Sequence, residues 1–495
     1  VEAEAEEDAW VEEEEERAFP TTFKTSAATS ASYSFLGSGG VTHSVTDGPV
    51  DPELCDPSSP RSISGYMSVK GSEYDADGKD KHLFFWFFEK RPSGTLEEGE
   101  TEGDSSDVPL IVWLTGGPGC SSTLALLTEN GPCSVNKDGH GTTVNPYSWI
   151  ETAHVLWLDQ PAGVGYSYGK ENDSNEEMIS TDAYYFLQSF YKKHPEYASN
   201  PLYVVGESYG GHYAPAIAHK VFAENKKIPE EGSGAEGKDG KIKINLAGVA
   251  VGNGLTDPEE QYKWYGEMAF KNSHGIKVID ETTYDTMTAA IPECTALIHK
   301  CNAGDSALNT FSCQAAFAFC NMAMTSPYRL TGLNPYDIRK KCGLNPLCYD
   351  FSNVETFLNL EETRKALHVS DEAPREWQSC NMGINLKFHT DWMKDFAPYV
   401  ADMLEGGLPV LIYAGDVDFI CNYLGNRAWT LNLDWNRNAE FNAADDHDWN
   451  DGKGLARSAN GLTYLQVYDA GHMVPSDQPE VALDMIQEFV TGGSF

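Results

Sequence analysis

The chain has 495 residues, of which 41% are hydrophobic and 12% aromatic, and this composition excludes a protein that is disordered throughout. Asp and Glu number 75 against 35 Lys and Arg, a formal net charge of −40. Such an acidic balance argues against a nucleic-acid-binding protein and against docking on an anionic membrane surface. The apolar runs are also too short to predict a transmembrane helix.

The first 50 residues are predicted to be a tail or the remnant of a pro-segment. Residues 1–17 are mostly acidic, so we expect them to be solvated. The stretch from Ala18 to about Pro49 is rich in Ser, Thr and Gly, and ordered structure is expected to begin near Ile63. No signal peptide is visible, and a leader is expected to have been removed.

Beyond this tail, short apolar runs predict strands buried on both faces of a sheet, and amphipathic segments predict helices between them. The predicted strands are His82–Lys90, Leu110–Leu114, His154–Asp159, Leu202–Val205, Leu246–Val251, Pro409–Ala414 and Leu462–Tyr468. The predicted helices are Asp182–Tyr197, Tyr213–Lys226, Trp392–Leu404 and Glu480–Val490. This alternation predicts an α/β fold with a mostly parallel sheet.

The alternation stops from about Thr256 to Glu376, in a block that holds six of the eleven cysteines. We expect an insertion at 256–376 between two parts of one core, at 51–255 and 377–495. The clustered cysteines indicate disulfides and an oxidising compartment. No zinc pattern is present, and the sequon at Asn172 predicts a glycosylation site.

The segment Gly206–Gly210 has the G-x-S-x-G pattern of a nucleophile elbow. As a bare string the pattern is weak, but here it follows an apolar strand and precedes a helix, the setting that an elbow requires. The glycines allow a sharp turn that lifts the hydroxyl of Ser208 above the sheet. We therefore predict Ser208 as a nucleophile; the alternative is a tight turn with a passive serine.

A serine nucleophile needs a histidine base and an acid that orients this base, in the chain order Ser, acid, His. Asp416 and Asp418 follow one late predicted strand, and His472 follows another on a Gly-flanked loop. His472 is the better base candidate, because its rival His212 should point along a helix and serve capping or packing. The residues alone barely separate the two aspartates.

Gly116 and Gly117 come directly after another predicted strand. Adjacent glycines at this position present backbone N–H groups to an anion, and with the amide of Tyr209 they would form an oxyanion hole. The alternative is an ordinary Gly-Pro turn.

Six motifs in this order resemble the serine carboxypeptidases, in particular fungal vacuolar and secreted enzymes of the carboxypeptidase Y type. They are WLTGGPGCSS (113–122), DQPAGVGYS (159–167), GESYGGHYAP (206–215), GNGLTDP (252–258), YAGDVDFICN (413–422) and GHMVPSDQPE (471–480). The resemblance runs from about Cys55 to Phe495. It implies an α/β-hydrolase fold, with a mostly parallel central sheet and a disulfide-rich, largely helical cap. It also implies a triad of Ser208, Asp418 and His472 and an oxyanion hole from Gly117 and Tyr209.

The resemblance further implies a site for the terminal carboxylate of a peptide substrate, formed by Thr115, Gly116, Glu129 and Glu207. Thr115 departs from the family, which has Asn at this position. If Glu129 and Glu207 were ionised they would repel the substrate, whereas a protonated carboxyl donates a hydrogen bond to it. Carboxypeptidase activity is therefore expected to be best at acidic pH.

Two side-chain pockets and a set of disulfides complete what the resemblance implies. Residues expected to line the pockets are Leu255, Tyr262, Tyr265, Trp392, Ile420 and Cys421 for the penultimate side chain, and Tyr336, Tyr349 and Met473 for the leaving residue. The implied disulfides are Cys294–Cys320, Cys301–Cys313, Cys342–Cys348 and Cys120–Cys380, with Cys55–Cys133 as the remaining pair and Cys421 as a free thiol.

The resemblance predicts a serine-type carboxypeptidase, secreted or vacuolar, monomeric or homodimeric, that needs no metal or organic cofactor and acts on peptide C-termini. Because of Thr115, one alternative stays open, namely an esterase or acyltransferase of the same group. A non-catalytic binding protein on a hydrolase scaffold is the other alternative, and the intact Ser208, Asp418 and His472 argue against it.

Overall fold

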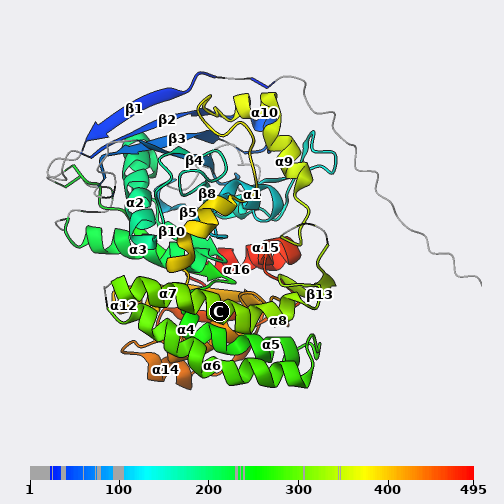
Figure 1. The fold of residues 1–495 in the computed structure, drawn as a ribbon. Coiled ribbons are helices and arrows are strands. Elements are labelled where there is room, and N and C mark those ends of the chain that lie inside the picture. Colours follow the sequence, from blue (N-terminus) through cyan, green and yellow to red (C-terminus); the bar gives the residue numbers. More distant parts are fainter. Residues whose placement is uncertain are drawn as a thin grey trace, which may run out of the picture.

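A computed structural model describes residues 23–24, 26–34, 41–59, 61–72, 74, 80–92, 105–228, 232, 234, 236–237, 240–304, 307–343, 345 and 347–495. In this part of the chain, thirteen strands form one sheet in the order β1-β2-β3-β4-β8-β5-β10-β11-β14-β17-β16-β15, with β9 paired to β4 (Figure 1). The strands are β1 (Thr29–Ser34), β2 (Thr42–Pro49), β3 (Ser62–Lys70), β4 (Lys81–Phe88), β5 (Leu110–Thr115), β8 (His154–Leu158), β9 (Tyr168–Gly169), β10 (Leu202–Glu207), β11 (Leu246–Gly252), β14 (Val410–Gly415), β15 (His447–Trp449), β16 (Gly454–Ala459) and β17 (Leu462–Val467).

The centre of the sheet, from β8 through β5, β10, β11 and β14 to β17, is parallel, and both edges are antiparallel. All seven predicted strands are present. They read as continuous apolar runs because successive residues face two different cores: Leu110, Val112 and Leu114 of β5 belong to one, and Ile111 and Trp113 to the other. This confirms the predicted α/β fold.

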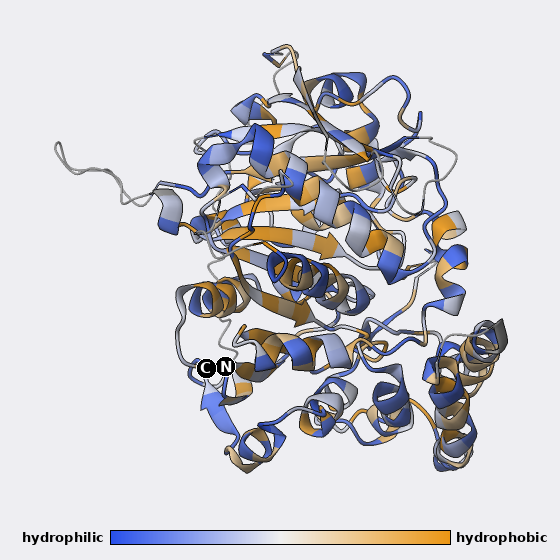
Figure 2. Cartoon of the chain, turned by 90° about the vertical axis from the view of Figure 1, so that its left-hand side faces the viewer, coloured by the Kyte–Doolittle hydropathy of each residue, from blue (hydrophilic) through white to orange (hydrophobic). Residues whose placement is uncertain are grey.

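The helices are α1 (Ser122–Thr128), α2 (Glu176–Lys193), α3 (Gly210–Asn225), α4 (Pro258–Gln261), α5 (Tyr265–Lys271), α6 (Glu281–Asn302), α7 (Ala307–Cys320), α8 (Ser326–Arg329), α9 (Ser352–Asn359), α10 (Glu361–Ala366), α11 (Met382–Lys387), α12 (Ala397–Glu405), α13 (Tyr423–Asn432), α14 (Asn438–Ala443), α15 (Val474–Asp477) and α16 (Pro479–Thr491). Helices α2, α3 and α12 share a core with one face of the sheet, and α1 and α16 share a core with the other. In Figure 2 the strands are largely hydrophobic and the surrounding helices carry both colours, as expected for helices with one buried face.

All four predicted helices exist, with shifted starts. α2 begins at Glu176, because the side chain of Asn175 accepts a hydrogen bond from the amide of Met178 and caps the helix. α12 begins only at Ala397, whose amide donates to the side chain of Asp395 at 2.9 Å. The residues from Trp392 to Phe396, predicted to be helical, are therefore a connecting segment.

The prediction of a tail up to residue 50 is wrong for two segments, because β1 and β2 extend the sheet. β2 pairs with β3 over Thr42–Pro49, and Val41 and Val45 are buried in the core. The Ser and Thr content predicts a tail here, yet Ser44 and Thr46, beside these valines, lie on the partly exposed face of a strand that pairs on both sides. Residues 1–17, predicted to be solvated, lie outside the described residues.

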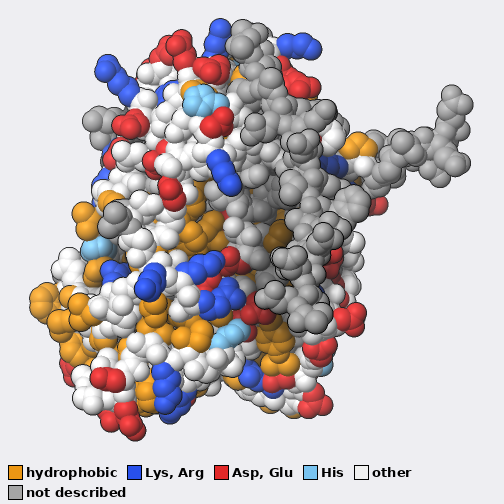
Figure 3. All heavy atoms as spheres, turned by 90° about the vertical axis from the view of Figure 1, so that its right-hand side faces the viewer, with side chains coloured by type: hydrophobic (Ala, Val, Ile, Leu, Met, Phe, Trp, Pro, Cys, Tyr) orange, Lys and Arg blue, Asp and Glu red, His pale blue; other side chains and the backbone are white. Residues whose placement is uncertain are grey.

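The helical insertion forms a cap over one end of the sheet, the lower part of Figure 1. It contains α4 to α8, a π-helical turn η6 (Asn321–Thr325), and the short strands β12 (Leu333–Asn334) and β13 (Asp337–Lys341). Hydrophobic side chains gather on the lower part of the face seen in Figure 3. The most exposed apolar residues of the cap are Phe311, Met322 and Leu330.

The cap ends earlier than the predicted boundary at 376. Helices α9 and α10 lie at the other end of the molecule from α5 and α6 (Figure 1). Val354, Phe357 and Leu358 of α9 pack into the core that contains α1. The amphipathic pattern of α9 shows that it buries one face, but not against which partner.

The disulfides join the same cysteines that the resemblance implies: Cys55–Cys133, Cys120–Cys380, Cys294–Cys320, Cys301–Cys313 and Cys342–Cys348. Cys133 lies on β6 (Cys133–Val135), which pairs with β7 (Thr142–Val144). Cys421 is a buried free thiol. In the described part of the chain, no helix combines the length and apolar composition needed to cross a membrane.

Candidate active site

Ser208 occupies the tight turn between β10 and α3, with a left-handed φ of 63°. Its amide donates to the carbonyl of Gly252, and its carbonyl accepts from the amides of Gly211 and Leu255. A Cβ on Gly206 would lie 2.5 Å from the carbonyl oxygen of Gly210, so only glycine fits there. The strained serine and the close backbone approach are the features of a nucleophile elbow.

Asp418 and His472 meet at the ends of neighbouring strands, β14 and β17. The Nδ1 atom of His472 lies 2.8 Å from Oδ2 of Asp418, and both residues are buried. The amides of Ile420 and Cys421 donate to the carboxylate of Asp418 at 3.0 and 3.2 Å. This arrangement fixes the tautomer and the orientation of the imidazole.

The alternative acid and the alternative base both face elsewhere. Asp416 lies 3.0 Å from His274 and accepts a hydrogen bond from the amide of Asp469 at 2.9 Å. His212 places Nδ1 2.6 Å from the carbonyl oxygen of Leu255, and burial lowers its pKa to about 4. The geometry therefore favours the pair of Asp418 and His472.

Asn253 is a further residue of this site, to which the sequence analysis assigns no role. Its Nδ2 donates to Oδ2 of Asp418 at 2.8 Å, and its Oδ1 accepts from the amide of Gly415 at 3.0 Å. Asn253 lies in the GNGLTDP motif at the end of β11, with a φ of 40°. A polar residue that directly follows a central parallel strand is the sequence signal that could have indicated Asn253 as a site residue.

The turn after β5 lies against the start of α3. A Cβ on Gly116 would be 2.3 Å from the amide nitrogen of Tyr209. Within the described chain, the amides of Gly117 and Tyr209 donate no hydrogen bond. The carbonyl of Gly117 accepts from Asn385 at 3.1 Å, which holds the turn in place. Two unused N–H groups beside an elbow serine are the donors that an oxyanion hole requires, as the sequence predicts.

Glu129 and Glu207 form a buried carboxyl pair next to the elbow. Glu129 follows α1, Glu207 ends β10, and they are 6% and 3% exposed. Each of the two carboxyl groups contributes to the pKa shift of the other, and within the described chain Oε2 of each has no hydrogen-bond partner. Burial raises the pKa of Glu129 to about 7, and burial together with the charge of Glu129 raises that of Glu207 well above its ordinary value.

Thr115 lies at the end of β5 and is 9% exposed. Its Oγ1 accepts a hydrogen bond from Nε1 of Trp113 at 2.9 Å. The hydroxyl of Thr115 uses one lone pair of its oxygen to accept this hydrogen bond. Its proton therefore stays available as a donor.

The residues predicted to line the first pocket come from the cap and from the segment before α12. Nε1 of Trp392 donates to the hydroxyl of Tyr262 at 3.1 Å, and the hydroxyl of Tyr265 donates to the carbonyl of Ile420 at 2.7 Å. Leu255 and Cys421 are joined through their amides to Ser208 and Asp418. The structure thus brings this set together beside Ser208 and Asp418.

The predicted second pocket lies on the His472 side. The ring of Tyr336 is 5.0 Å from that of His472 and 5.4 Å from that of Tyr349. The carbonyl of Tyr336 accepts from the amide of His472, and Met473 is the next residue in the chain. These residues therefore lie beside His472.

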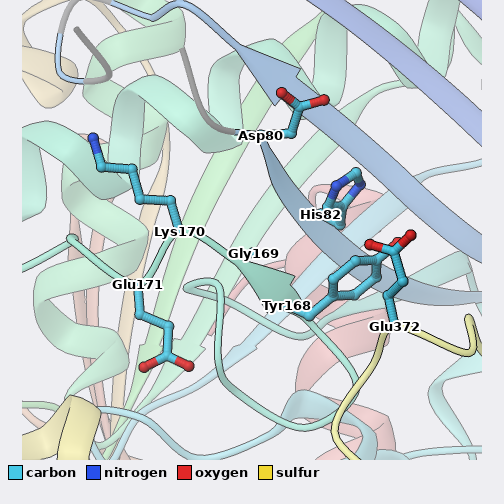
Figure 4. A pocket seen from close by; sticks show the side chains of 7 residues that line it. All are labelled: Asp80, His82, Tyr168, Gly169, Lys170, Glu171 and Glu372. Atoms are coloured by element: carbon cyan, nitrogen blue, oxygen red, sulfur yellow. The ribbon is translucent and has the colours of Figure 1, made fainter. Parts of the chain in front are cut away.

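A separate pocket of about 510 Å³ lies at the start of β4 and beside β9 (Figure 4). It is lined by Asp80, His82, Tyr168, Gly169, Lys170, Glu171 and Glu372, none of which is a predicted site residue. Nearby, Nδ2 of Asn172 donates to the carbonyl of Tyr74, and glycosylation of Asn172 stays a prediction. Among the described residues, no group of three or more His, Cys, Asp or Glu is placed to hold a metal ion.

Comparison with known proteins places this geometry in a family. The family model described as serine carboxypeptidase matches residues 52–492. Carboxypeptidase Y homolog A of Leptosphaeria maculans is 41% identical over 451 residues, which cover 90% of this chain and 76% of that protein. Carboxypeptidase Y of Candida albicans is 41% identical over 438 residues, which cover 87% of this chain and 73% of that protein.

A solved structure has the same architecture. The crystal structure of Kex1Δp, a prohormone-processing carboxypeptidase from Saccharomyces cerevisiae, superposes with a TM-score of 0.73 at 27% identity. The match covers 90% of this chain and 95% of that chain.

Proposed function

This chain belongs to the serine carboxypeptidase family, and from that premise we propose that Ser208, Asp418 and His472 are the triad with which it releases C-terminal residues from peptides. Ser208 attacks the scissile carbonyl while His472 takes its proton through Nε2. Asp418 holds the imidazole and stabilises its charged form. His472 then returns the proton to the leaving amine, and water hydrolyses the acyl-enzyme by the same route.

The amides of Gly117 and Tyr209 stabilise the charge that develops on the carbonyl oxygen. Both are unused donors in the described chain, and the fit of Gly116 against Tyr209 holds them close together. Such preorganised donors stabilise the tetrahedral state more than the ground state, and this difference accelerates the reaction.

The observation that carries the exopeptidase assignment is the Glu129–Glu207 pair, buried directly before the nucleophile. A protonated carboxyl donates a hydrogen bond to the terminal carboxylate of the substrate, whereas two ionised carboxylates would repel it. Because burial raises the pKa of both groups, the protonated form persists through the acidic range. We therefore expect activity on peptides with a free C-terminus to be favoured at acidic pH.

Thr115 supports a second candidate function, an esterase or acyltransferase that does not require a free carboxylate. A hydroxyl offers one donor where the family amide offers two. Weaker recognition of the carboxylate would relax the specificity while the triad stays intact.

The five disulfides support passage through the secretory pathway to an extracellular or vacuolar location. A monomer or homodimer remains the expected oligomeric state.

The test compares two N-blocked dipeptides, one with a free C-terminus and one amidated, from pH 4.5 to 7.5. We expect kcat/KM for the free acid to exceed that for the amide at pH 4.5, and this preference to fade as the pH rises. The double variant Glu129→Gln and Glu207→Gln keeps neutral donors at every pH, so its preference should be about tenfold higher than that of the wild type at pH 7.5.

Equal rates on the two substrates at every pH would contradict the carboxypeptidase assignment and favour the esterase. Failure of a fluorophosphonate to label Ser208 would contradict both hydrolase assignments and favour a binding protein.

A further inference from the structure

The hairpin of β12 and β13 in the cap is fastened to both turns that carry the acid and the base of the proposed triad. The carbonyl of Pro335 accepts a hydrogen bond from the amide of Phe419 at 3.0 Å, directly after Asp418. The carbonyl of the next residue, Tyr336, accepts from the amide of His472 at 2.9 Å. Two consecutive residues of the cap therefore hold the acid turn and the base turn at the same time.

The same segments also touch backbone to backbone. A Cβ on Gly471 would lie 2.4 Å from the carbonyl oxygen of Tyr336, and a Cβ on Gly415 would lie 2.2 Å from the carbonyl oxygen of Gly471. Because these backbones are in direct contact, a shift of the hairpin also moves the turn of His472. The position of the hairpin is thus part of the geometry of the triad.

Arg339 of β13 joins the hairpin to the base turn through its side chain. Its Nε and Nη2 donate to the two carboxylate oxygens of Asp337, each at 2.9 Å. Nη2 also donates to the carbonyl of Asp469 at 3.2 Å, in the turn that leads to His472. The amide of Asp469 donates to Asp416, so this residue is bound both to the cap and to the acid turn.

Asp337 gives the guanidinium a fixed anchor. Its side chain is 1% exposed, against 33% for that of Arg339. Its Oδ1 also accepts from the backbone amide of Arg339 at 3.0 Å, and Nζ of Lys340 lies 3.0 Å from its Oδ2. Burial acts to raise the pKa of Asp337, but the hydrogen bonds from Arg339 and Lys340 outweigh it and lower the pKa below its ordinary value. The carboxylate therefore stays charged in the acidic range, and the planar guanidinium keeps one orientation.

We propose that Arg339 is a positioning residue for His472. With Asp337 as its anchor, the guanidinium holds the carbonyl of Asp469, and with it the turn from which the imidazole reaches Asp418. This inference rests on the proposed function, and it gives the cap a task in the chemical step besides substrate binding. Because the imidazole must meet the nucleophile and the acid at once, a small displacement of its turn slows proton transfer.

The first test measures how fast a small fluorophosphonate labels Ser208, a reaction that needs His472 but no bound peptide. Arg339→Ala should lower the second-order rate constant about tenfold, the size expected for one charge-assisted hydrogen bond. On an N-blocked dipeptide, kcat should fall by the same factor with little change in KM. Arg339→Lys keeps a charge beside Asp337 without the planar fork, so this variant should be folded and still slower than the wild type.

Arg457 offers a matched control. Its Nε donates to Asp446 at 2.7 Å and its Nη1 donates to the carbonyl of Asn442 at 3.0 Å, so it too joins a carboxylate to a backbone carbonyl. These partners belong to neither turn of the triad. Arg457→Ala should therefore lower the melting temperature while the labelling rate and kcat stay at the wild-type values.

The second test is chemical rescue of Arg339→Ala by guanidinium chloride, at a concentration too low to unfold the protein. A free guanidinium ion can occupy the place of the missing side chain between Asp337 and Asp469. It should restore a large part of the labelling rate, whereas sodium chloride at the same concentration should not.

The possible failures are distinguishable. A wild type in which Ser208 is not labelled contradicts the proposed function. A labelled wild type with folded Arg339→Ala and Arg339→Lys variants that react equally fast contradicts the positioning role alone. A higher KM with unchanged kcat in these variants would also contradict it, because Arg339 would then act on substrate binding. Rescue that sodium chloride reproduces would mean that the guanidinium geometry has no part in the effect.

Discussion

The orientation of Asp418 depends on one buried amide, that of Asn253. The carboxylate of Asp418 accepts hydrogen bonds from Asn253, Ile420 and Cys421 besides its contact with His472. The two backbone amides hold the carboxylate from its own turn. Asn253 reaches it from the end of β11, on the side opposite to β17 and His472, so we expect it to set the angle at which Asp418 meets the imidazole.

Asn253→Gly should therefore lower kcat by about ten- to a hundredfold with little change in KM, the size expected for one charge-assisted hydrogen bond. Glycine accepts the φ of 40° at this position, so the change removes the side chain without straining the backbone. Steady-state kinetics, normalised by titration of the active serine, measures the effect. A kcat equal to that of the wild type would show that the two backbone amides suffice.

At the scale of elements, the proposed oxyanion hole is the junction between the turn after β5 and the first turn of α3. The two segments touch backbone to backbone, since a Cβ on Gly116 would reach the amide nitrogen of Tyr209 and the carbonyl of Glu207. The disulfide Cys120–Cys380 and the side chain of Asn385 hold the same turn from the α11 side. The hole thus exists only where three distant segments meet.

Gly116→Ala should push the two segments apart and lower kcat at least a hundredfold, the usual result of losing an oxyanion-hole donor. Gly343→Ala is the control, because nothing lies within 4 Å of the added methyl group. Circular dichroism and the melting temperature establish whether each variant is folded. Wild-type activity in a folded Gly116→Ala variant would contradict this account of the site.

At the scale of the whole molecule, two sets of buried groups give opposite pH dependences of stability. Burial raises the pKa of several carboxyl groups, among them Glu129, Asp257 and Asp391 to about 7 and Asp159 to about 6. Burial lowers the pKa of three histidines, His43, His154 and His212, to about 4. Raised carboxyl pKa values stabilise the folded state at low pH, and lowered histidine pKa values destabilise it there.

The two effects oppose each other between about pH 4 and 6.5, where unfolded histidines take up protons and unfolded carboxylates have released theirs. Above about pH 6.5 the unfolded histidines lose their remaining protons, and above about pH 7.5 only the carboxyl groups still differ between the two states. The free energy of unfolding should therefore fall from pH 6.5 to 8, by about 1 kcal/mol for each group with a pKa of about 7.

Asp257→Asn isolates one of these groups away from the triad. Asn also caps a helix well, so the hydrogen bond from the amide of Glu260 can be kept. Urea denaturation should show the variant to be about 1–3 kcal/mol more stable than the wild type at pH 8 and equally stable near pH 4. A difference that does not depend on pH would mean that Asp257 is ionised in the folded protein.

The amino-acid sequence by itself determined the sheet, the elbow and the family, because these features have local signatures. A strand buried on both faces, such as Leu110–Thr115, is a run of apolar residues, and a nucleophile elbow is five residues long. The chain order Ser, acid, His singled out Ser208 and His472, and the break in the strand–helix alternation marked the cap as an insertion.

The tertiary structure decided what depends on contacts between distant segments. Asp416 and Asp418 lie in the same turn, and only the position of His472 shows which of them it meets. Asn253 and Asp418 are 165 residues apart, and Arg339 and Asp469 are 130 apart, so no local pattern connects them. The same reason explains the unexpected strands β1 and β2, which extend one side of the sheet, and the placement of α9. A segment's own residues show that one face is buried, whereas its partner is fixed only by the folded core.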